Sequence, residues 1–590
     1  MAILLIPFVP NLSLAKDFSD AGSLWAPPAS SAMVENSSMD EFSQAEPSCQ
    51  RIDLLILRAN LNLNLAELTR KIEENGGCAR HIFPPIYILG YIPDNVLDYL
   101  NTKGWLDKIY TPNAVQEATK DATLPNWLRD IWLQTILPTT SSVLDESNAE
   151  LGKPLNGDVR RLAEEAVNPT IQAESGYAPG YYQTSEFMAG KIAVGIIFPE
   201  SNGTLDPNSE NWNQIRMDKV VSKIQSAMNW WATQNPNGKL SFIYDIHKQV
   251  ATKYEPILSY STQDYLWIND VFSKLNFTST SLRKNTFDYL NSLRNVYHTD
   301  WAVVAFVVDS YNDADGSFPD GYFAYTYVNP GLIVMTYDND GWGIDRMDSV
   351  MAHEFSHDFG ADDEYCEVGY SCCWGGLVDN YSYLYIPNSN CEAGCDNNRN
   401  GICDGNDSTP NSNCQNCPSC VRVPCLMRDG TIDAGLDVPT KQQVGIRDSD
   451  GDGILDPLDT TPTITVTNYP PLVVISNSAI VSFKGYVQDI PYTTPNPAKS
   501  SVTINYITDI QVQWDSSPDW ITIPTQDGAY DSTLEYFDYS SPPFFLGTHV
   551  IKIRAHNRSG IVSQVYQYTF TVLPLDPSLY SYIYLPIILK

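Results

Sequence analysis

The chain has 590 residues and a formal net charge of −34, with 43% hydrophobic and 12% aromatic residues. This length predicts several domains, and the apolar content is ample for packed cores, which argues against global disorder. Nucleic-acid phosphates and anionic membrane surfaces would repel so acidic a chain, so we expect neither as a partner. No apolar stretch reaches the length of a membrane-spanning helix, so we expect no membrane span.

The N-terminal third predicts a leader, a small domain and a linker. Residues 1–50 begin with an apolar, signal-like segment and continue as a flexible leader rich in Ser, Pro and acidic residues. Over residues 51–111 the patterns follow the order β-α-β-β-α-β, which predicts a ferredoxin-like domain. Residues 112–184 are polar and partly Pro-rich, as in an exposed linker. The predicted elements are strand 54–57, helix 65–74, strands 81–83 and 86–89, helix 93–100 and strand 106–110.

Residues 185–447 alternate between strand and helix patterns, as in an α/β domain. Unbroken apolar runs at 191–198 and 301–308 predict strands that are buried on both faces. Residues 212–233 carry apolar side chains at helical spacing, which predicts a core helix rather than a cofactor-binding segment. Residues 322–328 alternate aromatic with small or polar residues, which predicts an exposed edge strand. Further strands are predicted at 240–246, as half-buried, and at 332–337.

Two histidines in this region, His353 and His357, predict a metal site. On a helix they lie on one face a turn apart, so both imidazoles can reach one zinc ion. Glu354 lies about 100° round the helix, close enough to take a proton from a water on the metal without binding the metal itself. Gly360 lets the helix end and the chain turn, which swings Asp363 back as a third ligand.

Two details of this helix remain open in the sequence. The helix is expected to start near Asp345, with that side chain as the N-cap. A shifted turn would present Asp362 or Glu364 to the metal in place of Asp363, which we prefer because of its spacing from Gly360.

The run H-E-x-x-H-x-x-G-x-x-D, from His353 to Asp363, resembles the zinc signature of the metzincin peptidases, in the variant with aspartate as the third ligand. The longer string H-E-F-x-H-D-F-G-x-x-D-E-Y is similar to the active-site helix of secreted bacterial immune inhibitor A-like peptidases, and the aspartate also to that of snapalysins. The resemblance covers roughly residues 185–460. It implies a methionine turn beneath the metal, for which Met427 is the sole downstream candidate.

The resemblance implies a zinc-dependent endopeptidase that keeps one metal position open for water, with Glu354 taking the proton of that water and returning it to the leaving amine. Residues 51–111 then resemble the prodomains of secreted peptidases, and 112–184 the rest of a pro-segment, so we expect a secreted bacterial zymogen. An extended protein substrate is expected to pair as an added strand along 321–327. Tyr365 is a guess for further oxyanion stabilisation.

The cysteines point to an oxidising compartment. Ten of the twelve lie between Cys366 and Cys425, and such a dense, even cluster predicts an insertion stapled by five disulfides. The alternative is a zinc knuckle, because three of these cysteines have ligand-like spacing. Cys49 and Cys78 lie in one small unit, so we expect a disulfide between them rather than a thiolate cap on the zinc. The spacing that suggests the knuckle is Cys414-x-x-Cys417-x-x-Cys420.

Two acidic stretches have the ligand rhythm of calcium loops. Residues 448–462 contain D-S-D-G-D-G-I-L-D-P-L-D, which resembles thrombospondin type 3 and dockerin-like loops, and residues 396–407 in the insertion repeat the spacing. For each, the alternative is a solvated acidic turn. We expect calcium to fix a domain junction, not to catalyse. The ligands of the first loop would be Asp448, Asp450, Asp452, Ile454 (carbonyl), Asp456 and Asp459. Those of the second would be Asp396, Asn398, Asn400, Ile402, Asp404 and Asp407.

After a linker at 462–470, residues 468–575 alternate short β-rich runs with turns, which predicts an immunoglobulin-like β-sandwich. We expect the sandwich to contact substrate, cell surface or matrix, or simply to act as a spacer, and leave the apolar tail at 576–590 without a role. Two rival functions stay open. One is a calcium-dependent adhesion protein with a non-catalytic peptidase-like domain, and the other is a zinc amidase that acts on cell-wall peptides. The strands of the sandwich are predicted at 473–475, 480–487, 502–514, 520–523, 549–555 and 565–572.

Overall fold

The computed structural model describes residues 49, 51–59, 64–136, 159, 160, 162, 177–364, 381–386 and 424–575, all within one unit, Pro47–Lys590. Several predictions lie outside the described residues. They are residues 1–48 of the leader, most of the linker between 137 and 176, the calcium loop at 396–407, the cysteine-rich insertion apart from residues 381–386, 424 and 425, Tyr365 and the tail at 576–590.

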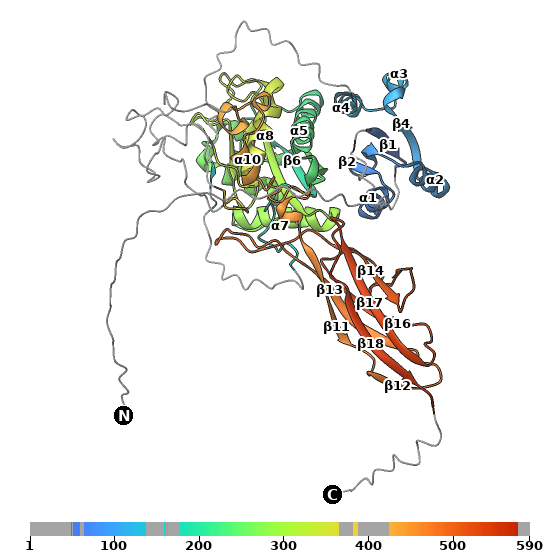
Figure 1. The fold of residues 1–590 in the computed structure, drawn as a ribbon. Helices are drawn as coiled ribbons and strands as arrows, with labels where there is room; N and C mark the ends of the chain where they lie inside the picture. Colours follow the sequence, from blue (N-terminus) through green and yellow to red (C-terminus); the bar gives the residue numbers. More distant parts are fainter. Residues whose placement is uncertain are drawn as a thin grey trace, which may run out of the picture. The chain divides into compact units, whose positions relative to one another are not determined.

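The chain is a multidomain α/β protein with one large mixed sheet and a separate pair of smaller sheets (Figure 1). The large sheet has ten strands in the order β4-β1-β3-β2-β7-β6-β8-β10-β9-β5. Its strands are β1 Asp53–Leu57, β2 Cys78–Phe83, β3 Tyr87–Tyr91, β4 Leu106–Tyr110, β5 Val159–Arg160, β6 Lys191–Ser201, β7 Ser241–Thr252, β8 Trp301–Val308, β9 Ala324–Tyr327 and β10 Leu332–Thr336.

The first four strands pair antiparallel, and two helices, α1 Leu65–Glu74 and α2 Asp94–Lys103, complete the predicted β-α-β-β-α-β order. Helix α1 begins where Asn64 caps it by accepting from the Glu67 amide, the type of contact that makes Asn a good N-cap. Cys49 and Cys78 form a disulfide, which confirms the predicted pair and excludes a thiolate cap on a metal. Strand β2 then pairs in parallel with β7, so this small unit and the following α/β region share one sheet.

The prediction of an exposed linker from residue 112 is wrong over its first part. A short 3₁₀ turn, Pro112–Ala114, leads into α3 Val115–Lys120 and α4 Asn126–Ile136. Helix α4 buries Leu128, Ile131 and Trp132, and the Trp132 indole donates to the Ile52 carbonyl, 3.0 Å away. The helix was missed because its six apolar residues, from Trp127 to Ile136, lie within a longer stretch that is polar overall.

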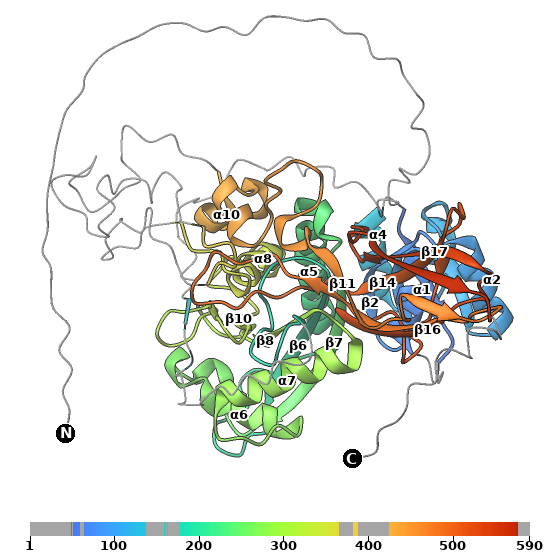
Figure 2. The same cartoon turned by 60° about the horizontal axis from the view of Figure 1, so that its bottom comes forward.

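Helices cover both faces of the parallel strands β7-β6-β8-β10 (Figure 2). Helices α5 Gln214–Gln234 and α8 Met347–Asp358 share one hydrophobic cluster with alternate residues of β6 such as Val194. Helices α6 Tyr265–Lys274 and α7 Leu282–Tyr297 share the other cluster with the intervening residues, such as Ala193. Neither α6 nor α7 is predicted from the sequence.

Three local predictions for this region are wrong. Strand β7 is buried, not half-buried, from Ser241 to Tyr244, because β2 covers its outer edge. All four residues of the predicted exposed strand β9 are buried, since β5 pairs along its free edge and α8 packs on one face. Asp345 does not cap the helix that carries His353 and His357. It lies in the 3₁₀ turn Ile344–Arg346 with its side chain 85% exposed and paired with Lys219, and α8 starts two residues later.

The C-terminal region forms two sheets, β11-β13-β16 and β12-β18-β17-β14-β15, which share one hydrophobic core. The predicted linker at 462–470 is wrong, because most of it belongs to β11, which pairs with β13; strand β16 was also missed. The strands are β11 Thr461–Asn468, β12 Val473–Ile475, β13 Ser482–Ile490, β14 Ile507–Trp514, β15 Ile521–Thr522, β16 Leu534–Ser540, β17 Gly547–Asn557 and β18 Tyr566–Leu573. Among the described residues, no helix has the length and apolar composition needed to cross a membrane.

The remaining helical elements are short. They are α9 Leu426–Asp429, α10 Val438–Gln443 and the 3₁₀ turns Pro236–Gly238, Pro256–Leu258, Ser261–Gln263, Ile432–Ala434 and Asp456–Leu458.

Candidate metal centre

Helix α8 is buried on all sides, with eleven of its twelve residues inside the protein. It nevertheless carries His353, Glu354 and His357, which are at most 1% exposed. Buried polar groups are costly unless they find partners, so the contacts of these side chains show what the helix is built to hold.

Three acceptor atoms converge at one point beside this helix. The Nε2 atoms of His353 and His357 lie 3.2 Å apart, and Oδ1 of Asp363 lies 3.0 Å from the first and 3.4 Å from the second. Gly360 permits the turn that brings Asp363 back. Its φ is +93°, and a side chain there would meet the backbone of Ser382 at 2.7 Å.

The far nitrogens of both rings face backbone carbonyls. Nδ1 of His357 lies 2.8 Å from the Ala361 carbonyl, and Nδ1 of His353 lies 3.3 Å from the Leu426 carbonyl. A ring that donates from Nδ1 presents a lone pair at Nε2, as in histidines that bind metals. The structure thus directs two lone pairs and one carboxylate oxygen at a common point.

Such a group needs a positive charge. Burial acts to raise the pKa of the Asp363 carboxyl, yet the two histidines hold that pKa well below its usual range. Burial acts to lower the pKa of His357, yet Asp363 raises it to about 10. Without an ion, a proton supplies the charge. A tetrahedral zinc site with bonds of about 2.0–2.1 Å separates its ligand atoms by roughly 3.3–3.4 Å, so the donor set fits this ion.

The turn presents Asp363, and neither of its neighbours, to the histidines. Gln443 holds Asp362 by donating from Nε2 to its carboxylate at 3.0 Å and accepting from its amide at 3.1 Å. A carboxylate oxygen of Glu364 instead lies within 4.8 Å of ligand atoms of Cys425 and Asp437. The geometry therefore favours Asp363 among the three alternatives that the sequence left open.

Glu354 has one occupied and one unoccupied oxygen. Its Oε2 accepts from the Thr326 hydroxyl at 2.7 Å, while Oε1 is buried and has no hydrogen-bond partner among the residues that the structure describes. Burial raises the pKa of Glu354, although the two histidines act to lower it. Sequence reasoning missed Thr326. The signal was available, because a threonine between Tyr325 and Tyr327 on a strand must face the opposite side from both rings.

Met427 lies in a short helix beside the centre. Its Sδ is 2.8 Å from the Ser356 hydroxyl, and its carbonyl accepts from the Glu364 amide at 3.0 Å. The preceding residue, Leu426, supplies the carbonyl that faces His353. The prediction of five disulfides in the insertion is wrong for Cys425, which is a buried free thiol 3.2 Å from the Thr440 hydroxyl.

The loop at 448–459 brings together only part of its predicted ligand set. Carboxylate oxygens of Asp448, Asp450 and Asp452 lie within 4.8 Å of one another at the surface. Asp456 is buried and its carboxylate binds Arg447 and the Ser449 amide, so the structure does not place it with this group. Burial, and then the charges of all four of these aspartates, raise the pKa of Asp459. The carbonyl of Ile454 was the predicted ligand, whereas the contact that the structure describes is made by its amide, which donates to the Asp452 carboxylate at 2.8 Å.

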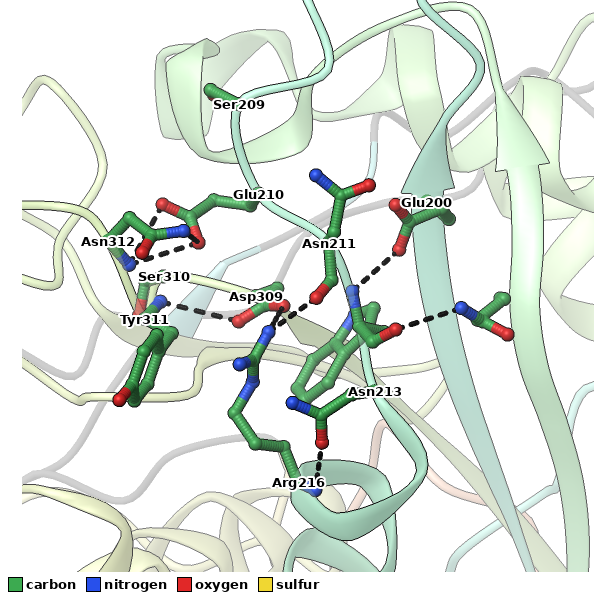
Figure 3. Close-up of polar contacts among 12 residues, drawn as sticks. Glu200, Ser209, Glu210, Asn211, Asn213, Arg216, Asp309, Ser310, Tyr311 and Asn312 are labelled. Atoms are coloured by element: carbon green, nitrogen blue, oxygen red, sulfur yellow. Dashed lines mark hydrogen bonds and ion pairs between the residues drawn. The ribbon is translucent and has the colours of Figure 1, made fainter.

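A third acidic cluster, not predicted from the sequence, closes the loops that follow β6 and β8 (Figure 3). Here each carboxylate already binds protein donors. Glu200 accepts from the Trp212 amide at 2.9 Å, and Asp309 accepts from the Arg216 guanidinium at 2.6 Å. Glu210 accepts from the backbone and side chain of Asn312 at 3.0 Å. Protein donors thus contact each of these three carboxylates and tie the two loops together.

Comparisons with known proteins do not place this chain in a family. No protein-family model matches it, and no curated protein matches it. Solved structures match parts of it. Fibronectin(III)-like modules of Clostridium thermocellum CbhA match 20% of this chain and 48% of their own at 14% identity, with a TM-score of 0.13. The SrpA adhesin of Streptococcus sanguinis matches 20% and 58% at 14% identity, with a TM-score of 0.14. A beta-glucosidase from Listeria innocua matches 66% and 48% at 8% identity, also with 0.14.

In each of these three comparisons the match covers less than two thirds of the solved structure's own chain. Scores and identities this low carry no argument about fold or function.

Proposed function

We propose that this chain is a secreted, zinc-dependent endopeptidase of the metzincin type. His353, His357 and Asp363 hold the metal, and Glu354 is the general base. The observation that carries the proposal is the convergence of two Nε2 lone pairs and one carboxylate oxygen within 3.4 Å, beside a buried glutamate. When bound, zinc supplies a Lewis acid that lowers the pKa of water and polarises a carbonyl.

The residues of the chain supply the proton transfer. Thr326 holds one oxygen of Glu354, and the other oxygen is left to take a proton from the attacking water and return it to the leaving amine. Because burial raises the pKa of Glu354, its carboxylate is a stronger base than an exposed one. Strand β9, which carries Thr326, would hold an extended substrate by main-chain pairing once β5 has left its edge.

Other features support a secreted zymogen of this type. The Cys49–Cys78 disulfide suits an oxidising compartment. The order β4-β1-β3-β2 in the first unit agrees with a ferredoxin-like prodomain. The contacts of Met427 with Ser356 and Glu364 suit a methionine turn that supports the ligands. The aspartates at 448–452 suit a calcium ion at the boundary with an immunoglobulin-like sandwich.

The test is casein hydrolysis by the purified full-length chain, after limited trypsin treatment and complete inhibition of the trypsin. Wild type is expected to bind one zinc per chain by elemental analysis and to cleave casein. Glu354→Gln is expected to keep the zinc and to lose activity by about 10²- to 10⁴-fold.

Glu117→Gln, an exposed position on α3, is the matched control and is expected to behave as wild type. An active Glu354→Gln variant would refute the assignment of the base. A wild type that binds zinc but cleaves no protein would favour the adhesion protein or the cell-wall amidase.

A further inference from the structure

A half-buried arginine, Arg160, lies on the other side of β9 from Glu354. Strand β5 pairs in parallel with β9, with Val159 opposite Thr326 and Arg160 opposite Tyr327. The Val328 amide donates to the Arg160 carbonyl at 3.1 Å and extends this pairing. Since side chains alternate along β9, the face of Tyr325 and Tyr327 is opposite the face on which Thr326 holds Glu354.

The Arg160 guanidinium is bound by both polar and aromatic groups. Nη1 donates to the Ser261 carbonyl at 3.0 Å, and Nη2 donates to the Ser261 hydroxyl at 2.7 Å. Its Cζ lies 3.6 Å from the ring centroid of Tyr325 and 4.6 Å from that of Tyr322. A planar guanidinium suits this combination of a forked donor and stacked rings, which an ammonium cannot match.

Two carboxylates make the surroundings negative. Asp264, 1% exposed, accepts from the hydroxyls of Tyr325 at 2.8 Å and Tyr327 at 3.0 Å. Asp320 holds Ser261 in place, through its amide at 3.0 Å and its hydroxyl at 2.7 Å. Burial acts to lower the pKa of Arg160, yet the tyrosines and Asp264 raise it, so the surroundings favour a cation.

The described contacts of the guanidinium lie within residues 261–327 of the α/β region, whereas the arginine itself comes from a two-residue strand about a hundred residues earlier. We call Ser261, Asp264, Tyr322, Tyr325 and Tyr327 the arginine site. This site is lined by groups that bind a cation, it lies on the edge that would pair with substrate, and its arginine comes from a separate segment. These are the properties of a substrate subsite that the chain fills with its own side chain.

We propose that the arginine site is a recognition subsite of the peptide-binding edge, filled in cis by Arg160 until β5 is displaced. A peptide that then pairs with β9 places an arginine side chain in the same site. The proposal rests on the proposed function for peptide cleavage, but its binding step can be measured without any catalysis.

The experiment measures peptide binding by isothermal titration calorimetry on full-length chains that carry Glu354→Gln, so that no peptide is cleaved. The probes are acetyl-Asp-Val-Arg-Ala-Leu-amide and its counterpart with alanine in place of arginine. With Arg160→Ala added, the arginine probe is expected to bind at least tenfold more tightly than the alanine probe. With Arg160 in place, neither probe is expected to bind, because the site is filled.

Tyr322→Leu, at a half-buried position, is then added to Arg160→Ala and is expected to reduce the preference for arginine several-fold without unfolding the chain. Equal binding of the two probes by the Arg160→Ala chain, or equal binding of the arginine probe with and without Arg160, would overturn the proposal. Near-ultraviolet circular dichroism establishes that each variant is folded.

The two proposals fail separately. If the Arg160→Ala chain prefers the arginine probe but the chain with Glu354 intact cleaves no protein, the arginine site stands and the peptidase does not. If casein is cleaved but neither probe is preferred, the peptidase stands and the arginine site does not.

Discussion

The histidine–aspartate group beside α8 and the aspartate group at 448–452 are both candidate metal sites, and they are built in opposite ways. The first is buried, and each imidazole is oriented by a carbonyl behind it. The second lies at the surface, and its carboxylates accept from amides of their own loop, such as those of Gly451 and Gly453. The loop can keep its shape through these bonds without an ion, whereas the buried group requires a positive charge at its centre.

The difference predicts how each site responds to loss of its ion. A buried group of converging acceptors cannot be solvated, so removal of the cation must be answered by a proton or by rearrangement. An exposed loop is screened by water and gains only the binding free energy of its ion. Under the proposed function, removal of zinc is expected to abolish casein hydrolysis, and removal of calcium is expected to lower stability by a modest amount.

The largest effect is expected from the ligands themselves. Asp363→Asn is expected to reduce bound zinc from one per chain to well below half, and casein hydrolysis by at least about 10²-fold, because a neutral amide replaces the one anionic ligand. Asp362→Asn is the matched control, since Gln443 rather than a histidine holds that carboxylate. Full zinc content in Asp363→Asn together with zinc loss in Asp362→Asn would show that the turn presents the neighbouring residue.

A smaller loss of activity is expected when Thr326, the residue that positions the proposed base Glu354, is changed. Thr326→Val keeps the shape of the side chain and removes the bond to Glu354 Oε2, so kcat is expected to fall about 10-fold with KM and zinc content unchanged. Thr336→Val, at a buried position on β10 whose hydroxyl contacts the Gly316 carbonyl, is the control for loss of a buried hydroxyl. If both variants lose the same activity, Thr326 has no specific role in positioning the base.

At the aspartate loop the effect is expected on stability alone. Saturating calcium is expected to raise the melting temperature of the wild type by a few degrees, as for binding worth about 2–3 kcal/mol, and to leave zinc content unchanged. In the double variant Asp450→Asn, Asp452→Asn the calcium-dependent shift is expected to vanish. Asp519→Asn, at an exposed position of the sandwich, is expected to keep it. A shift that survives the double variant would mean that calcium binds elsewhere.

The sequence allowed prediction of elements whose signals are local. The amphipathic spacing predicts the bounds of α1 to the residue, and the buried run at 301–308 coincides with β8. The spacing from His353 to Asp363 likewise predicts which side chains meet, because a helical turn and a glycine suffice to bring them together.

What escaped prediction depends on distant segments. The burial of β9 follows from β5, which lies more than 150 residues away in the sequence, and the burial of β7 follows from β2 in the same way. Thr326 reaches Glu354 only because β9 packs on α8. The sequence of a strand does not show which distant segment pairs along its edge, so the alternation of residues 322–328 made β9 resemble an exposed edge strand.

The acidic cluster at the ends of β6 and β8 extends the comparison to a third case (Figure 3). Like the candidate metal centre it is largely buried, but its carboxylates accept from protein donors, which are mostly amides together with the Arg216 guanidinium. Glu255 accepts from the amides of Ser209 at 2.8 Å and Glu210 at 3.2 Å, and its own amide donates to Asp206. If protein donors alone satisfy the carboxylates, burial should raise their pKa values above those of exposed carboxylates. If the cluster holds a cation, the cation should lower these pKa values.

Burial, and then the charges of Glu200 and Glu210, raise the pKa of Glu255 to about 7, although the amides of Glu210 and Ser209 act to lower it. The folded chain therefore binds this proton more tightly than the unfolded chain does. The resulting stability is fully present below the unfolded pKa of about 4.5 and is lost as pH rises towards 7. Glu255→Gln imitates the protonated form, so its melting temperature should match wild type near pH 4.5 and exceed it at pH 8.

The gain at pH 8 is expected to be about 1–2 kcal/mol, because solvent screening reduces the full effect of the shift. Thermal unfolding of both chains at several pH values measures it, and the difference between them cancels the contribution of the shared net charge. Glu117→Gln should show no pH-dependent difference. The opposite result would be a Glu255→Gln chain that is less stable than wild type at pH 8, with a difference that grows when calcium is added. That result would show that the cluster holds a cation, because only a bound cation makes a charged carboxylate more stabilising at this position than a neutral amide.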